Sequence, residues 1–129
     1  MERTYIAADD RHSLFYRALR VQLQSAGVNL VETAAESTAT FSIVYDETDQ
    51  RVLSVSARNV PTEYEVYYTI QYGIDSGPKK LLENQSLTVT RDYTYDSTLV
   101  LGKAREEELM RAAIVDDLVR IVQKQISSL

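Results

Sequence analysis

The residue types that carry most enzyme chemistry are scarce in this sequence. His12 is the only histidine, and none of the 129 residues is a cysteine. Nucleophilic catalysis of the serine type needs a histidine beside a serine and a carboxylate. Ser13 adjoins the histidine, but its neighbours form no nucleophile-elbow motif. We therefore interpret His12 as a polar residue near the start of a helix.

The acidic residues also offer no convincing site. Asp46, Glu47 and Asp49 could supply oxygen ligands, but they lack the glycine and the terminal glutamate of a calcium-binding loop, so a solvated turn is expected. Asp116 and Asp117 are neighbours on a predicted helix, where their side chains point about 100° apart. The four glycines form no phosphate-binding motif. The sequence therefore predicts no metal, no cofactor and no enzymatic activity.

The composition is that of an ordinary globular domain, which we place at residues 1–129. Hydrophobic residues make up 44% of the chain and charged residues 26%, which excludes wholesale disorder. No stretch approaches the roughly 18 to 20 apolar residues that cross a bilayer, so no membrane span is expected. The net charge is −5, whereas a protein that binds duplex DNA needs basic groups to neutralise phosphates. Nucleic acid is therefore not expected as a partner.

Tyrosine is the overrepresented aromatic residue, with nine copies beside two phenylalanines and no tryptophan. Tyr64, Tyr68 and Tyr72 alternate on one face of a predicted strand that also carries valine and isoleucine. Core and cross-strand packing explain this pattern. An aromatic surface that contacts a partner protein is the alternative. Tyr67 fits that alternative better than the others, because it lies on the opposite, polar face.

One basic residue interrupts the pattern of a second strand. Arg91 lies between Val89 and Tyr93, where the alternation calls for an apolar side chain. An arginine at such a position must meet an anion or keep its guanidinium in water. A structural ion pair with an acidic residue near the helix is the simplest expectation.

Two predicted helices frame the chain. The first runs from His12 to Ala26, with Asp9 and Asp10 as N-cap candidates and Gly27 where a left-handed residue would end it. The second has a cluster of glutamates near its start, and its apolar stripe comprises Ala112, Val115, Leu118, Val119, Val122, Ile126 and Leu129. In its early part, Glu108 and Arg111 have the i,i+3 spacing of an ion pair.

Between these helices the apolar period changes to two, which is typical of strands. Short connections between successive runs favour an antiparallel meander. The order predicts a single α+β domain with helices on one face of a sheet. Its elements are a possible edge strand at 5–8, a short extended piece at 28–33, strands at 41–45, 53–57, 63–74 and 87–93, a turn at 46–49 and a hairpin connection at 75–80.

The C-terminal third resembles a known family. The stretch VTRDYTYDSTLVLGKAREEELMRAAIVDDLVRIVQKQI (89–126) is similar to the lipopolysaccharide-assembly lipoproteins of the LptE (RlpB) family, which share a basic-aromatic strand end and an (L/A)-x-K-x-x-E-E helix entry. The segments 13–31 and 61–74 resemble the first helix and central strand of that family. The matching positions in the C-terminal third are Arg91, Tyr93, Tyr95, Lys103, Glu106, Leu109 and Asp116.

The resemblance implies a fold, a partner and a location. The implied fold is a two-layer sandwich with two helices on one face of a four-stranded, mostly antiparallel sheet in the order β-α-β-β-β-α. The implied protein is a lipoprotein of the Gram-negative outer membrane that faces the periplasm, plugs the LptD β-barrel, assists its assembly and binds lipopolysaccharide. The opening residues contain no secretion signal or lipobox cysteine, as expected of a chain that starts after the acylated residue.

The resemblance also implies candidate binding residues. Arg58, Lys103 and Arg91 are expected to contact the phosphates of lipopolysaccharide, for which arginine and lysine are suitable chemistry. Tyr67, Tyr93 and Tyr95 are expected to contact the partner protein. Two other roles remain open: a free-standing periplasmic carrier, which would need an apolar cavity between sheet and helices, and a small hydrolase. For Lys103, an ion pair with Glu106 or Glu107 is the structural alternative.

Overall fold

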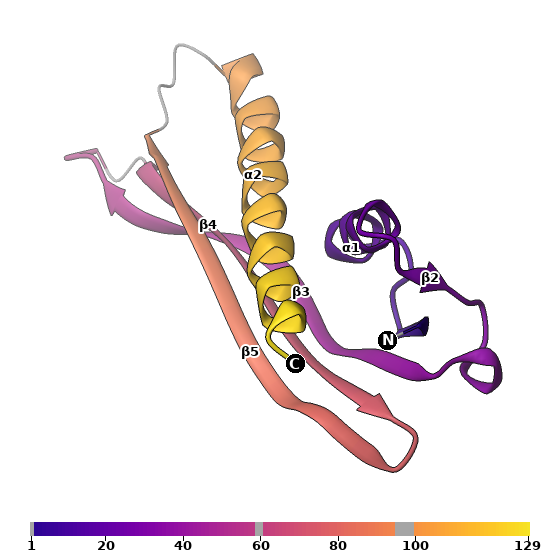
Figure 1. Cartoon of the computed structure of the whole chain (residues 1–129). Helices are drawn as coiled ribbons and strands as arrows, with labels where there is room; N and C mark the ends of the chain where they lie inside the picture. Colours follow the sequence, from indigo (N-terminus) through magenta and orange to yellow (C-terminus); the bar gives the residue numbers. More distant parts are fainter. Residues whose placement is uncertain (1, 59–60, 95–99) are drawn as a thin grey trace.

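The computed structural model describes residues 2–58, 61–94 and 100–129, without the side chains of 61–62 and 100–104. The layered arrangement in Figure 1 has one sheet, with both α-helices on the same face. In chain order, the elements within the described residues are β1 (Arg3–Ala8), α1 (Leu14–Ser25), β2 (Asn29–Leu30), a 3₁₀ turn (Ala34–Glu36), β3 (Ala39–Val55), β4 (Pro61–Ser76), β5 (Lys79–Thr94) and α2 (Val100–Ser127).

The sheet is mixed and has five strands in the order β2-β1-β3-β4-β5. β3, β4 and β5 form the expected antiparallel meander, whereas β1 runs parallel to both β2 and β3. The prediction of four strands with β1 at the edge was therefore wrong in this part of the sheet. After Gly27 the chain returns beside β1, where the Val31 amide donates to the Thr4 carbonyl at 2.9 Å and the two-residue β2 becomes the edge.

β3 contains the largest departure from the predicted strands. The acidic run 46–49 is not a turn, because β3 continues through it and pairs with β4 up to Val55. A bulge lies between Ile43 and Tyr45. One extra residue exchanges the two faces of a strand. Phe41 and Ile43 are therefore buried before the bulge, while after it Tyr45 is exposed and Asp46 is partly buried.

The first helix begins about one helical turn after Asp9 and Asp10, the residues predicted to cap it. The N-cap is Ser13, whose hydroxyl accepts a hydrogen bond from the Tyr16 amide at 2.9 Å. Asp10 instead accepts from the amide of His12 at 2.8 Å. At the other end, Gly27 has a φ of 87°, which confirms the predicted left-handed residue.

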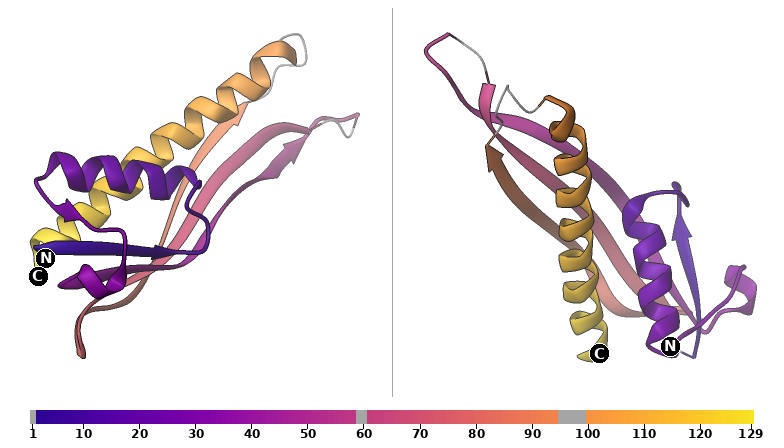
Figure 2. Two further views of the ribbon diagram at one scale, coloured as in Figure 1. Left: turned by 90° about the vertical axis from the view of Figure 1, so that its right-hand side faces the viewer. Right: turned by 90° about the horizontal axis from the view of Figure 1, so that it is seen from above.

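Both helices pack their apolar sides on the sheet. Figure 2 shows α2 lying along the meander and α1 lying over β1. The predicted stripe of α2 is confirmed at its centre, but Ala112 and Leu129 are exposed and Ile114 is buried. No helix within the described residues is long and apolar enough to cross a membrane. The largest fully buried side chains are Tyr68, Tyr72, Phe15, Phe41, Leu19, Leu23, Ile70, Ile74, Ile114, Leu118, Val66 and Val122.

Tyr72 is unusual among these core residues, because its hydroxyl is buried without a hydrogen-bond partner among the described residues. Its ring stacks on Phe41, with 4.8 Å between the centroids and 3° between the planes. Burial raises the pKa of Tyr72 to about 12. The phenol is therefore neutral when folded, and the stability that depends on this neutrality is lost as the pH rises from about 10, where tyrosine ionises in unfolded chains, to about 12.

Tyr72→Phe is expected to leave the free energy of unfolding unchanged or to raise it by up to about 1 kcal/mol. The substitution removes a buried polar atom that has no hydrogen-bond partner among the described residues, and it keeps the stacked ring. Tyr68→Phe is the matched control, since the Tyr68 hydroxyl is bonded at both ends, and it should cost about 1–3 kcal/mol. Urea unfolding at neutral pH measures both. The Tyr72→Phe chain should also lose less stability than the parent between pH 10 and 12. A clear loss of stability in Tyr72→Phe would contradict the unbonded hydroxyl.

Candidate functional site

Most of the expected binding residues lie at one end of the molecule. Figure 2 shows that the end of β3, the start of β4, the end of β5 and the start of α2 extend beyond α1 and β1. We call this region the distal end and define it as residues 51–58, 63–67, 91–94 and 103–111. Arg58 is exposed there, and its backbone amide donates to the Ser56 hydroxyl at 3.2 Å. The side chain of Lys103 and all of Tyr95 lie outside the described residues, so the predictions for them remain predictions.

A polar network holds the first half of α2 to the sheet at the distal end. The Tyr93 hydroxyl lies 3.0 Å from Oε1 of Gln50 and 2.5 Å from Oε1 of Glu107. Arg111 approaches the same glutamate at 3.8 Å and donates to the Thr48 hydroxyl at 3.2 Å. The predicted pair of Arg111 with Glu108 was thus wrong, because the i,i+4 partner faces the sheet while Glu108 is exposed. Burial and the bond to Glu107 raise the pKa of the Tyr93 phenol well above its usual range.

Tyr93 and Tyr67, both expected to contact a partner protein, lie in different environments. Tyr93 is 5% exposed, and its ring stacks on that of Tyr64 with 5.3 Å between centroids. Its ring is therefore part of the core of this chain. Tyr67 is half-buried, and the guanidinium of Arg51 lies 4.6 Å from its ring centroid. Arg51 also pairs with Glu65 at 2.7 Å, so an ordered arginine–tyrosine pair lies on the distal end.

Arg91 forms the ion pair that its position in the strand predicted. Its guanidinium lies 3.0 Å from Oδ2 of Asp117 on α2, and Arg120 pairs with the other oxygen of the same carboxylate. The pair is partly exposed, so its contribution to stability is small. The interpretation as a structural pair is confirmed, while a role for Arg91 in phosphate binding remains a prediction.

A second polar cluster holds the start of α1, and sequence reasoning missed it. Asp46, at the β3 bulge, accepts hydrogen bonds from the hydroxyls of Ser13 and Tyr68, both at 2.5 Å. The Tyr68 hydroxyl in turn accepts from the amide of Phe15 at 3.2 Å. Burial, followed by the bond to Asp46, raises the pKa of the Tyr68 phenol well above its usual range. The bulge brings Asp46 to this cluster. The position of a one-residue bulge cannot be predicted from the alternation of apolar residues, so this contact could not be predicted either.

This cluster also bears on the hydrolase hypothesis. The Ser13 hydroxyl is bonded to Tyr16 and Asp46, as a helix cap, and His12 is exposed beside it. No bond between the two side chains appears among the described residues. Within the same residues, no three His, Asp or Glu side chains are grouped so as to hold a metal ion. Among the described residues, Ser13 and His12 therefore do not form a bonded nucleophile–base pair.

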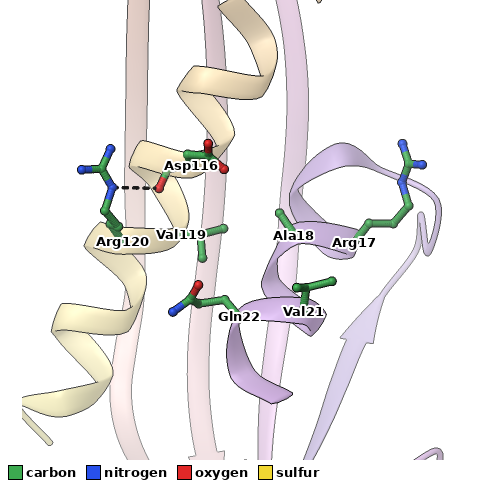
Figure 3. Close-up of a pocket in the computed structure, with 7 residues that line it drawn as sticks. All are labelled: Arg17, Ala18, Val21, Gln22, Asp116, Val119 and Arg120. Atoms are coloured by element: carbon green, nitrogen blue, oxygen red, sulfur yellow. Dashed lines mark hydrogen bonds between the residues drawn. The ribbon is translucent and has the colours of Figure 1, made fainter. Parts of the chain in front are cut away.

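A groove of about 550 Å³ lies between α1 and α2 on the side away from the sheet. In Figure 3, Ala18 and Val119 line the groove between the two helices, while Arg17 and Arg120 lie on opposite sides of it. The carrier hypothesis placed a cavity between the helices and the sheet, where apolar side chains of both layers now form a packed cluster. The groove is instead open to solvent.

The fold is similar to that of several bacterial lipoproteins of known structure. It is similar to the rare lipoprotein B of Shewanella oneidensis (TM-score 0.81, 23% identity, 98% of this chain and 95% of that chain covered). It is also similar to an uncharacterized lipoprotein B of Nitrosomonas europaea (TM-score 0.83, 26% identity, 98% of this chain and 83% of that chain covered). A third similar structure is a minor lipoprotein of Acinetobacter baumannii (TM-score 0.79, 21% identity, 98% of this chain and 91% of that chain covered). No functionally curated protein matches the sequence.

The sequence itself matches the model of the LptE lipopolysaccharide-assembly family over residues 1–126. The chain therefore belongs to the LptE family, as the resemblance of its C-terminal third had indicated. A role in lipopolysaccharide assembly follows from this membership. The family is one of assembly lipoproteins and is not known for enzymatic activity.

Proposed function

We propose that this chain is the subunit that plugs an LptD-type β-barrel in the outer membrane, assists its assembly and binds lipopolysaccharide there. A lipid anchor upstream of this chain would hold it to the periplasmic side of the membrane. The proposal rests on membership of the LptE family and on the distal end of this chain. That region projects beyond the body of the fold and carries basic, aromatic and apolar side chains together.

The apolar and aromatic part of the distal end suits a protein partner. Val52, Leu53 and Val55 are exposed near the end of β3. The stacked pair of Arg51 and Tyr67 lies nearby, and interfaces are enriched in tyrosine and arginine. Single exposed apolar residues need no explanation, but several at one projecting end favour a contact surface.

The basic part of the distal end suits a phosphate-bearing lipid. The guanidinium of Arg58 is exposed and has no ion-pair partner among the described residues. Arg91, in contrast, is already paired with Asp117, so it would have to exchange that partner for a phosphate. The protein has a net charge of −5, and attraction of an anionic lipid therefore depends on local basic groups. On these grounds Arg58 is the strongest described candidate, and Lys103 on the first turns of α2 is its companion.

Arg58→Glu and Lys103→Glu are each expected to weaken lipopolysaccharide binding about tenfold at low salt, because an attraction to phosphate becomes a repulsion. Capture of lipopolysaccharide on the immobilised chain measures the binding. Arg17→Glu on α1 is the control, since it makes the same change in net charge away from the distal end. Unchanged binding in both distal variants would remove these residues from the site.

A further inference from the structure

The outer edge of β5 is an unprotected strand edge. β5 is the last strand in the sheet order, so only one of its edges is paired within the described residues. Natural sheets shield such edges with charges, prolines or bulges. The run from Gln85 to Thr90 (QSLTVT) contains no charge and no proline. Its register with β4 is continuous from Gln85 to Thr94, since the irregularities lie at the other end of the hairpin. Half of its backbone groups are therefore available to another strand.

The sheet face beside this edge is also incompletely covered. Leu87 and Val89 of β5 are only partly buried against the core. A groove of about 500 Å³ lies between β5 and α2 and is lined by Leu109, Met110 and Ala113 on the helix side. Leu109 is 59% exposed. A strand added next to β5 would place every second side chain on this face, where it would cover the partly exposed residues.

The charge of the groove indicates what kind of strand fits. Its lining includes Asp92 on β5 and Glu106 on α2, and neither has an ion-pair partner among the described residues. Arg91, the cation among the described lining residues, is paired with Asp117. On the opposite face of β5, Ser86, Thr88 and Thr90 carry hydroxyls and are followed by Asp92, and Thr88 lies within 2.9 Å of Thr69 on β4. A strand with apolar side chains toward α2, hydroxyls on the other face and a basic end would match the apolar wall, the hydroxyl face and the acidic end of β5.

We propose that the edge of β5 binds an extended segment of a partner protein by strand addition. The segment alternates apolar and small polar residues and carries basic residues at the end that lies near Asp92 and Glu106. Main-chain hydrogen bonds would supply much of the affinity, and the groove beside α2 would supply the specificity. The inference is carried by the edge and the groove alone, so it stands whether or not the chain plugs a barrel.

The probe is the synthetic peptide acetyl-KVTVTVTK-amide, titrated into the isotope-labelled full chain and followed by NMR. At about 1 mM peptide, we expect shifts confined to β5 and to residues 106–113 of α2. Exchange of alternate amides between Gln85 and Thr90 should slow about tenfold or more. Leu109→Lys should weaken binding about tenfold, because the side chain it removes forms the apolar wall. Val21→Lys is the control, since Val21 is 64% exposed on α1, outside this groove.

Three results would overturn the inference. The first is the absence of shifts along β5 with peptide, and the second is binding that Leu109→Lys leaves unchanged. The third is a set of concentration-dependent shifts along β5 without peptide, which would assign the edge to a second copy of this chain. Replacing the two lysines of the peptide with glutamates should weaken binding at low salt. Equal binding of the two peptides would contradict the role of Asp92 and Glu106.

Discussion

Tyr93→Ala is expected to lower the free energy of unfolding by about 3–5 kcal/mol, the range typical of truncating a buried aromatic residue. The substitution removes a ring that is 5% exposed and stacked on Tyr64. It also removes the hydroxyl that joins Gln50 of β3 to Glu107 of α2. The loss is a large part of the 5–15 kcal/mol that stabilises a typical domain. Urea unfolding followed by circular dichroism measures it.

Tyr93→Phe separates the two contributions. It keeps the stacked ring and removes the two hydrogen bonds, so it should cost about 1–3 kcal/mol. Because those bonds join α2 to the sheet, amide exchange in Tyr93→Phe should rise first at residues 105–111 of α2. Exchange that rises equally over the whole chain would contradict a local role for the network.

Asp46→Ala is expected to cost about 3 kcal/mol, because it leaves two hydroxyl donors without their charged acceptor. The carboxylate binds Ser13, the N-cap of α1, and Tyr68, whose hydroxyl supports the Phe15 amide. The start of α1 should therefore be the first part to lose protection from amide exchange.

Asp49→Ala is the matched control for this substitution. Asp49 lies three residues further along β3 and is exposed, and its carboxylate accepts only from the adjacent Gln50 amide among the described bonds. Its replacement should change stability by no more than about 0.5 kcal/mol. Similar losses in the two variants would show that Asp46 has no special position.

The sequence predicted the elements whose patterns are local. The alternation from Tyr64 to Ile74 corresponds to a strand whose inward residues are all buried, and Gly27 ends its helix in a left-handed conformation. The ion pair of Arg91 with an acidic residue of α2 also followed from one residue out of pattern. In each case, the spacing of neighbouring side chains was sufficient.

The remaining features depend on contacts between distant residues. The bulge before Tyr45 turns Asp46 inward, so an acidic run that resembles a turn becomes part of a long strand. The network of Tyr93 joins residues 14 and 43 positions apart in the chain. The short β2 adds to the sheet only because α1 returns the chain beside β1. No local pattern encodes these pairings.

Co-expression with an LptD-type barrel is the decisive test of whether this member of the LptE family acts as the plug of that barrel. The barrel from the same organism would be tagged, expressed together with this chain, and purified in detergent. If the chain is the plug, we expect a one-to-one complex that survives washing. If this chain elutes alone while the barrel folds normally without it, the chain is not the plug.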